Sequence, residues 1–198
     1  MKWNAGYPIF FNIFCWTLPA LIGCLAGYAA FKTIRIDLTI AVLAGMFFLS
    51  AFQHCYHVLK GKSTDKKPTP KLAKYACIYL FIILIIALYI ISERPLAAIG
   101  IGLGFVIVWL YSRSHHEELY GVGHAISMPT ACYITTGHLN IPVTLILAGI
   151  ALISSPALFA YRALTGDYNK EQAPKVLQRM LFVFTAGLTT LAAGFTLA

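Results

Sequence analysis

The sequence predicts an all-helical (all-α) protein whose about seven transmembrane helices form a polytopic membrane bundle. Of its 198 residues, 59% are hydrophobic and 11% are charged, and its mean hydropathy is +0.76, whereas about a quarter of the residues of an ordinary soluble domain are charged. The apolar stretches are continuous and lack the alternation of a lipid-facing barrel strand. Lipid admits only helices and closed barrels as spanning structures, so these stretches should be helices. We expect residues 1–198 to form a single transmembrane domain.

Seven apolar stretches approach the roughly 20-residue length that the core of a bilayer requires. The expected spans are 8–31, 37–59, 75–92, 96–112, 122–137, 141–162 and 180–198. The fourth is short and rich in glycine, and the fifth contains His124 and Pro129, so these two are the weakest; a re-entrant segment is an alternative for the fifth. Prolines inside the first, fifth and sixth spans should kink these helices, which favours a cavity between them.

Basic residues are distributed unequally between the two sides of these spans. Twelve of the 15 lie at the amino terminus or after the second, fourth and sixth spans, and the other three are Lys32, Arg35 and Arg94. Loops on the cytoplasmic side carry the excess of Lys and Arg. We therefore expect the amino terminus in the cytoplasm, the carboxyl terminus on the opposite side, and the three polar loops together on the cytoplasmic face.

The net charge of +8 fits this topology and an attraction to anionic lipid head groups. A funnel for an anionic substrate such as a diphosphate is the alternative interpretation. Binding of nucleic acid would require an exposed basic domain, and no stretch of the chain is long enough to form one. The partners expected from composition are membrane lipids and other membrane subunits.

Two histidines three positions apart end the second span, in the stretch FQHCYHVLKG at residues 52–61. At this spacing His54 and His57 share one face of a helix. Neutral imidazole is a poor ligand for Mg²⁺ but a good one for zinc, copper or iron. The pair is therefore a candidate metal site, and the alternative is that loops or lipid head groups satisfy both side chains by hydrogen bonds.

Five stretches in order along the chain carry a resemblance to a known family. They are WTLPALIGCLAGYAAF in the first span, FQHCYHVLKGKSTDKKPTPKLAKYA after the second, VIVWLYS closing the fourth, YGVGHAISMPTACYITTGHL through the fifth, and YRALTGDYNKEQAPKVLQRML after the sixth. In this order and spacing the chain resembles the UbiA superfamily of intramembrane prenyltransferases, in particular its naphthoate-prenylating branch. The resemblance covers nearly the whole chain and implies a UbiA-like bundle.

The resemblance also implies a diphosphate site on the cytoplasmic loops after the second and sixth spans. There the family has two Asp-rich motifs that hold Mg²⁺ against the diphosphate of an isoprenoid donor, because a hard cation prefers oxygen ligands. This chain departs from both motifs. The family's Asn-Asp-x-x-Asp falls on residues 53–57, where His54 and His57 replace two carboxylates, and the second loop offers Thr165, Asp167, Asn169 and Glu171.

The candidate binding residues follow from these alignments. Those for a ligand or a diphosphate are Gln53, His54, His57, Lys60, Asp65, Lys67, Tyr133, Arg162, Asp167, Asn169 and Glu171, and those for a metal are His54 and His57. Tyr133 is included because CYITTG, with Thr136 and Gly137, matches a family stretch that lines the prenyl-acceptor cavity. Arg162 would steer an anionic head group, or would snorkel to the interface.

Two functions remain open on the sequence. The favoured one is a degenerate, non-catalytic UbiA-like subunit that packs in a membrane assembly or binds an isoprenoid lipid, a quinone or a pigment, because too few carboxylates remain to stabilise a departing diphosphate. The alternative is a Mg²⁺-dependent prenyltransferase that moves an isoprenyl group from a prenyl diphosphate to an aromatic or lipid acceptor. Its site would be rebuilt from Asp65, Asp167, Glu171 and the basic loop.

Overall fold

The computed structural model describes residues 9–60, 69–114, 118–164 and 172–198, and every regular element in these ranges is an α-helix. The seven helices of the described residues are α1 (Ile9–Phe31), α2 (Ile36–Leu59), α3 (Pro70–Glu93), α4 (Ala97–Ser114), α5 (Glu118–Thr136), α6 (Ile141–Leu164) and α7 (Gln172–Leu197). The prediction of an all-helical fold is confirmed for this part of the chain. The fifth expected span is one continuous helix through Pro129.

α3 and α7 begin at least five residues before the expected spans, and α5 begins at Glu118 instead of residue 122. α3 starts at Pro70, because Thr69 caps it by accepting a hydrogen bond from the backbone N–H of Leu72 at 3.3 Å and because proline suits the first helical position. α7 starts at Gln172, and its polar first turns still bury Val176 and Met180 against α5. Hydropathy finds the apolar part of a helix and misses its polar first turns.

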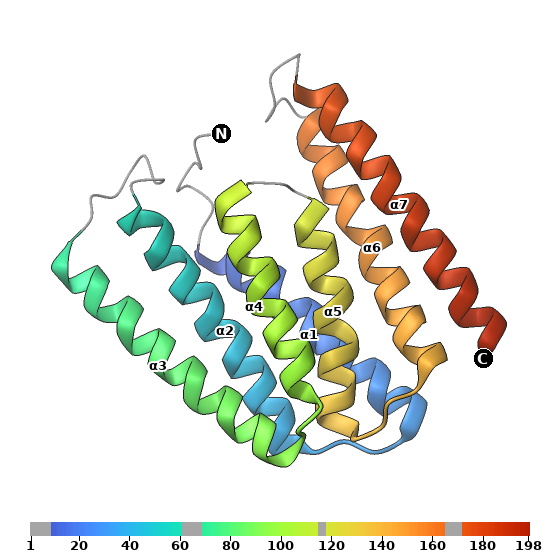
Figure 1. Ribbon diagram of the computed structural model, residues 1–198, viewed down its shortest axis with the longest axis horizontal. Helices are drawn as coiled ribbons and strands as arrows, with labels where there is room; N and C mark the ends of the chain where they lie inside the picture. The colour runs from blue at the N-terminus through green and yellow to red at the C-terminus, as the bar shows by residue number, and fades with distance from the viewer. Residues whose placement is uncertain (1–8, 61–68, 115–117, 165–171) are drawn as a thin grey trace.

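The helices run alternately up and down, so alternate connections lie at opposite ends of the bundle (Figure 1). At one end, here called the polar-loop end, α2, α4 and α6 finish and α3, α5 and α7 begin. The other, the short-turn end, holds the connections 32–35, 94–96 and 137–140. The helix ends that flank the three polar loops therefore lie at the same end of the bundle.

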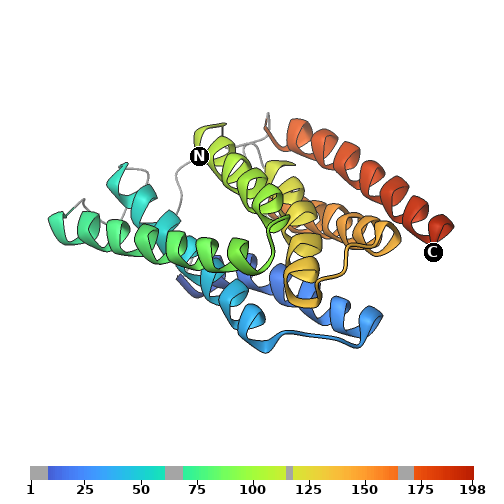
Figure 2. The ribbon, with the colours of Figure 1, turned by 60° about the horizontal axis from the view of Figure 1, so that its bottom comes forward.

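α5 is the central helix of the bundle and contacts α1, α2, α4, α6 and α7. Figure 2, in which the short-turn end comes forward, shows α5 between α1 on one side and α6 and α7 on the other. Nine of its 19 residues are buried. Its hydroxyl groups donate to carbonyls of the same helix, Thr135 to Ala131 and Thr136 to Cys132, at 2.9 and 2.8 Å.

Glycines let the neighbouring helices approach α5 closely. A Cβ at Gly23 of α1 would collide with the backbone carbonyl oxygen of Met128, and one at Gly100 of α4 would collide with the side chain of Thr130. A Cβ at Gly27 would lie 2.8 Å from Cγ2 of Thr136. Small residues at such crossings are typical of helix packing in membranes.

α6 and α7 form a hairpin packed along most of its length (Figure 2). Glycines again make this contact close: a Cβ at Gly149 would lie 2.7 Å from the backbone nitrogen of Leu191, and one at Gly194 would lie 2.9 Å from that of Ile146. At the polar-loop end, the guanidinium of Arg179 on α7 lies 3.4 Å from the carboxylate of Glu118 on α5.

The outer surface of the bundle is strongly apolar. Among the described residues, three helices are long and apolar enough to cross a membrane, over Ile36–Tyr56, Pro70–Glu93 and Ala173–Leu197. Large side chains such as Phe81 and Leu88 of α3 are exposed, whereas several polar ones, including Ser50, are buried. Soluble proteins rarely expose apolar surface on this scale, so these features are consistent with a membrane protein.

The close contact between α1 and α5 predicts that one methyl group added at Gly23 destabilises the protein. Gly23→Ala should lower the free energy of unfolding by about 2 kcal/mol or more, because a backbone carbonyl cannot move aside as a side chain can. Gly102→Ala on α4 is the control, since its Cβ would meet no described atom within 4 Å. Unfolding by SDS in mixed micelles measures both variants, and equal stability of the two would contradict the close contact.

Candidate functional site

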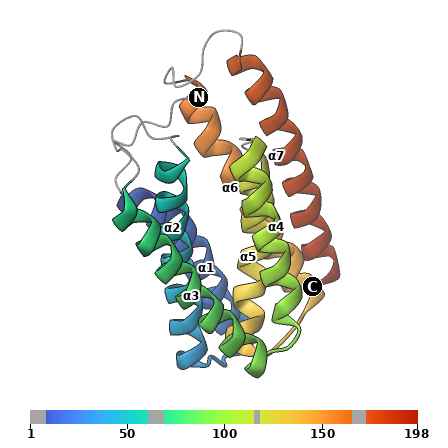
Figure 3. The same ribbon diagram turned by 60° about the vertical axis from the view of Figure 1, so that its left-hand side comes forward.

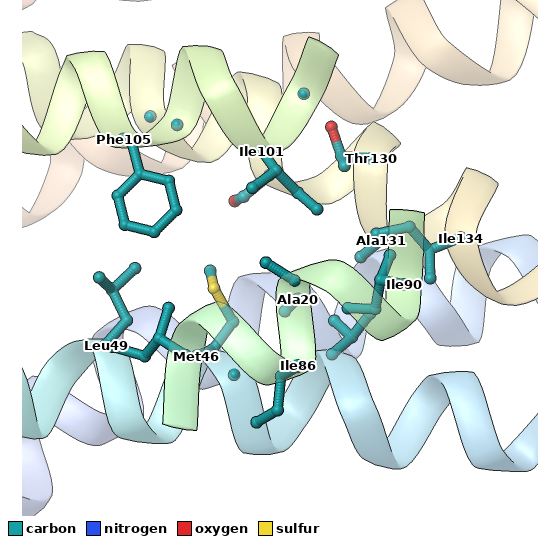
Figure 4. A pocket seen from close by; sticks show the side chains of 18 residues that line it. Ala20, Met46, Leu49, Ile86, Ile90, Ile101, Phe105, Thr130, Ala131 and Ile134 are labelled. Atoms are coloured by element: carbon teal, nitrogen blue, oxygen red, sulfur yellow. The ribbon is translucent and has the colours of Figure 1, made fainter. Parts of the chain in front are cut away.

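α3 and α4 lie close together at the short-turn end and diverge toward the polar-loop end, as Figures 1 and 3 both show. α2 packs along α3, and α4 packs along α5. Between these two helix pairs lies a cavity of about 120 Å³, lined by residues of α1 to α5 (Figure 4). It is referred to below as the interhelix cavity.

The walls of the interhelix cavity are mainly aliphatic. The side chains labelled in Figure 4 are Ala20, Met46, Leu49, Ile86, Ile90, Ile101, Phe105, Thr130, Ala131 and Ile134. Phe105 and Ile101 of α4 stand across the cavity from Leu49 and Met46 of α2. The described residues that line it include no charged side chain.

Two lining residues of α5 are polar, and their hydroxyl groups already donate within the helix. Thr130 donates to the carbonyl oxygen of Ile126 at 2.7 Å, and Ser127 donates to that of His124 at 3.3 Å. A bound molecule would therefore find two hydroxyl oxygens that can accept a hydrogen bond here, rather than two free donors.

Glycine keeps part of the interhelix cavity open. Gly104 of α4 lines it, and a Cβ at this position would meet no described atom within 4 Å. Gly100, one turn away, also lines the cavity, but its missing side chain is needed for the approach of Thr130. The two glycines therefore act differently, because one allows helix contact and the other leaves space.

The volume of the cavity sets the size of what it can hold. An apolar cavity of about 150 Å³ in a protein core accommodates benzene, so about 120 Å³ suits a short hydrocarbon segment such as one branched isoprene unit. A longer chain would have to continue beyond the cavity. The cavity is partly open to the exterior, and α3 and α4, which both line it, diverge toward the polar-loop end (Figure 3).

Polar contacts hold the short-turn end together. Arg35, between α1 and α2, donates hydrogen bonds to Asp37 at 2.9 Å and to Glu93 of α3 at 3.3 Å, and Tyr89 donates to Asp37 at 2.7 Å. The hydrogen bond to Asp37 raises the pKa of the Arg35 guanidinium above its ordinary value, so this residue stays charged. These groups are exposed, and exposed ion pairs contribute more to geometry than to stability.

The end of α5 joins the same set of contacts. The backbone N–H of Arg35 donates to the carbonyl oxygen of Thr135 at 2.8 Å, and the side chain of Arg94 donates to that of Ile134 at 3.3 Å. Gly137 ends α5 with a φ of 78°, and a Cβ there would lie 2.9 Å from the Arg94 guanidinium. α2, α3 and α5 are thereby fixed to one another below the interhelix cavity.

Toward the polar-loop end, the faces that line the cavity continue into buried polar groups. Ser50 and Gln53 of α2 are 2% and 8% exposed. Three buried atoms, Oγ of Ser50, Nε2 of Gln53 and Oγ1 of Thr17, have no hydrogen-bond partner among the described residues. Buried polar groups nearly always have one, so these atoms mark a place where a further polar group would fit.

The position of these residues follows from the helical repeat. Gln53 comes four residues after Leu49, and Thr17 comes three residues before Ala20. Residues at these spacings lie on the same face of a helix. The unpartnered atoms therefore lie about one turn beyond the apolar cavity, on the faces of α1 and α2 that line it.

The residues predicted from the sequence lie around this end. Gln53 is buried, His54 is half-buried, and Lys60 is exposed at the end of α2, with its ammonium 5.7 Å from the centroid of the Tyr56 ring. Tyr133 packs against the core cluster formed by residues of α1 to α5 and is outside the cavity lining. Asp65, Lys67, Asp167, Asn169 and Glu171 lie outside the described residues, as do the side chains of His57 and Arg162.

The metal site proposed for His54 and His57 stays a prediction. The described residues contain no group of three or more His, Cys, Asp or Glu side chains that could hold a metal ion, and the His57 side chain is outside them. Ser50 was not identified from the sequence, and the cavity expected from the prolines lay between the first, fifth and sixth spans, whereas the interhelix cavity is lined by α1 to α5. A serine within an apolar helix, one turn from Gln53, was the signal that could have indicated the buried polar site.

Comparison with known proteins returned no match from the protein-family models, the curated proteins or the solved structures. Membership of the UbiA superfamily therefore remains a prediction, and the function is inferred from the chain's own residues.

The buried amide of Gln53 predicts an increase in stability on its removal. Gln53→Leu should raise the free energy of unfolding of the ligand-free protein by about 1 kcal/mol, because a buried donor without a partner costs desolvation that leucine does not. Gln178→Leu, at an exposed position of α7, serves as the control in the same SDS titration. A loss of stability specific to Gln53→Leu would show that the amide is satisfied in the folded protein.

The histidine pair has its own test. If His54 and His57 bind a transition metal, purified protein should contain that metal in stoichiometric amount, because imidazole nitrogen is a strong ligand for such ions. Mass spectrometry of the elements in wild type and in the His54→Ala/His57→Ala variant measures it. Equal metal content in the two proteins would exclude the pair as the site.

Proposed function

We propose that this chain is a non-catalytic, multi-pass membrane protein that binds the branched hydrocarbon chain of an uncharged isoprenoid lipid in the interhelix cavity. The observation that carries the proposal is the cavity itself, which is aliphatic, lies inside the bundle and is kept open by Gly104. The aliphatic walls of this cavity favour a methyl-branched hydrocarbon chain over a charged or polar molecule.

Lipid would reach the cavity from the side. α3 presents exposed apolar side chains such as Leu84 and Leu88 on its outer face, and α3 and α4 diverge above their short connection (Figure 3). A hydrocarbon chain could therefore pass from the surrounding bilayer between these two helices without crossing water. Because such a chain would come from an apolar bilayer and not from water, its binding would depend on packing against the cavity walls.

The distribution of basic residues supports an amino terminus in the cytoplasm and a carboxyl terminus on the opposite side, with the polar-loop end facing the cytoplasm. The resemblance to the UbiA superfamily supports a bundle that has kept an isoprenoid cavity after losing the Asp-rich motifs. The exposed apolar faces of α3 and α7 are compatible with other membrane subunits packing around it.

Two glycines two residues apart on α4 provide a matched test of the cavity. Gly104→Leu should lower the affinity for phytane, a saturated isoprenoid hydrocarbon, by at least about tenfold, because leucine occupies the space of one isoprene unit. Gly102→Leu, on an exposed face of the same helix, should bind phytane like the wild type. Native mass spectrometry in a mild detergent measures the bound fraction.

Two outcomes would contradict the proposed function. Equal binding of phytane by both glycine variants would place the hydrocarbon elsewhere. Formation of a prenylated product from a prenyl diphosphate, Mg²⁺ and an aromatic acceptor would show that the chain is an enzyme, with its magnesium site built from loop residues.

A further inference from the structure

We infer that Ser50 and Gln53 form the head-group site of the interhelix cavity, and that they bind the carbonyl oxygen of an uncharged lipid. This inference rests on the proposed function, in which the hydrocarbon chain of the same lipid occupies the cavity. It adds the chemical class of the head group and the two side chains that recognise it.

Both side chains are buried donors that lack an acceptor. Ser50 is 2% exposed and Gln53 is 8% exposed, and neither Oγ of Ser50 nor Nε2 of Gln53 has a hydrogen-bond partner in the described part of the chain. Without a ligand, apolar residues at these two buried positions would make the protein more stable, because they would leave no donor unsatisfied. Two unsatisfied donors one turn apart on the same helix therefore indicate a ligand that brings the acceptor.

The direction of α2 turns these donors toward the cavity. α2 runs from the short-turn end to the polar-loop end (Figure 1), and side chains on a helix lean toward its amino terminus. Gln53 lies one turn, about 5.4 Å, beyond Leu49, which lines the cavity. Ser50 and Gln53 lie one turn beyond the residues that line the cavity, and their side chains would lean back toward its end.

The chemistry of the donors selects the head group. A carbonyl oxygen has two lone pairs and accepts two hydrogen bonds, which matches one amide N–H and one hydroxyl. Thr17 of α1 adds a third buried hydroxyl group without a described partner, which can donate to a second carbonyl oxygen of the head. The pattern suits a compact group with carbonyl oxygens.

The described residues around this position do not favour a negatively charged head group. α2 carries no Lys or Arg along its length, and its cationic neighbour Lys60 follows the helix at an exposed position two turns beyond Gln53. A buried diphosphate would need counter-charges there, because burial of an unpaired anion is strongly unfavourable. Arg179, at the same end of the bundle, already pairs with Glu118.

The test compares probes that share a phytyl-type chain and differ in the head. Phytane has no head group, phytyl acetate and phylloquinone carry carbonyl groups, and phytyl diphosphate is charged. Wild-type protein in mild detergent should bind one of the two carbonyl probes at least about tenfold more tightly than phytane. The probe that is preferred identifies the source of the carbonyl as an ester or a quinone.

The Ser50→Ala/Gln53→Leu variant should lose this preference and keep its affinity for phytane. Gln53→Met, which is nearly isosteric and has no donor, provides the same test if the double variant does not fold, and Gln178→Leu is the control for a glutamine elsewhere. In the infrared spectrum, the carbonyl band of bound, isotope-labelled probe should lie at lower frequency in the wild type than in the variant, because hydrogen bonds weaken the C=O bond.

The outcomes separate this inference from the proposed function. If the wild type does not bind phytane, the hydrocarbon site is wrong. If it binds phytane but prefers neither carbonyl probe, or if the variants keep the preference, the cavity stands and the head-group site at Ser50 and Gln53 is wrong. Tightest binding of phytyl diphosphate would likewise overturn the assignment of an uncharged head.

Discussion

Close approach of helix backbones to α5 is the constraint on which the rest of this structure depends. Between helices in lipid there is little hydrophobic driving force, so packing relies on small residues that let backbones meet. Gly23 brings α1 onto the carbonyl of Met128, and Gly100 brings α4 onto Thr130. α4 is thus held mainly against α5 and meets α3 only at the short-turn end, and the interhelix cavity is the space that this arrangement leaves.

The two ends of the bundle use polar groups in opposite ways. At the short-turn end, Arg35 and Arg94 satisfy backbone and carboxylate oxygens and join three helices. Toward the polar-loop end, Ser50 and Gln53 are buried with donors that no described residue satisfies. A molecule bound there would complete the hydrogen bonding and would connect helices that otherwise diverge, so it would stabilise the folded state by an amount that rises with the logarithm of its concentration above Kd.

Much of the helical arrangement could be predicted from the sequence, because hydropathy and charged breaks report the length of each helix directly. The polar start of α3 at Thr69 and Pro70 was not predicted, because hydropathy reports only the apolar part of a helix. The position of the cavity could not be predicted, since it depends on how α3 and α4 diverge. In the stretch GIGLGF, Gly102 and Gly104 look alike, yet only the second lines the cavity. Gln53 was found through a family alignment, and Ser50 only through its burial.

The central position of α5 has a consequence for biogenesis. α5 carries His124, Thr135 and Thr136 at buried positions, and such a helix partitions into lipid less readily than the more apolar α3. Three of the helices that shield it, α1, α2 and α4, precede it in the chain. For the multi-pass membrane protein proposed here, synthesis from the amino terminus would release α5 beside helices already in the membrane, so the order of the chain would shield the polar groups that α5 buries.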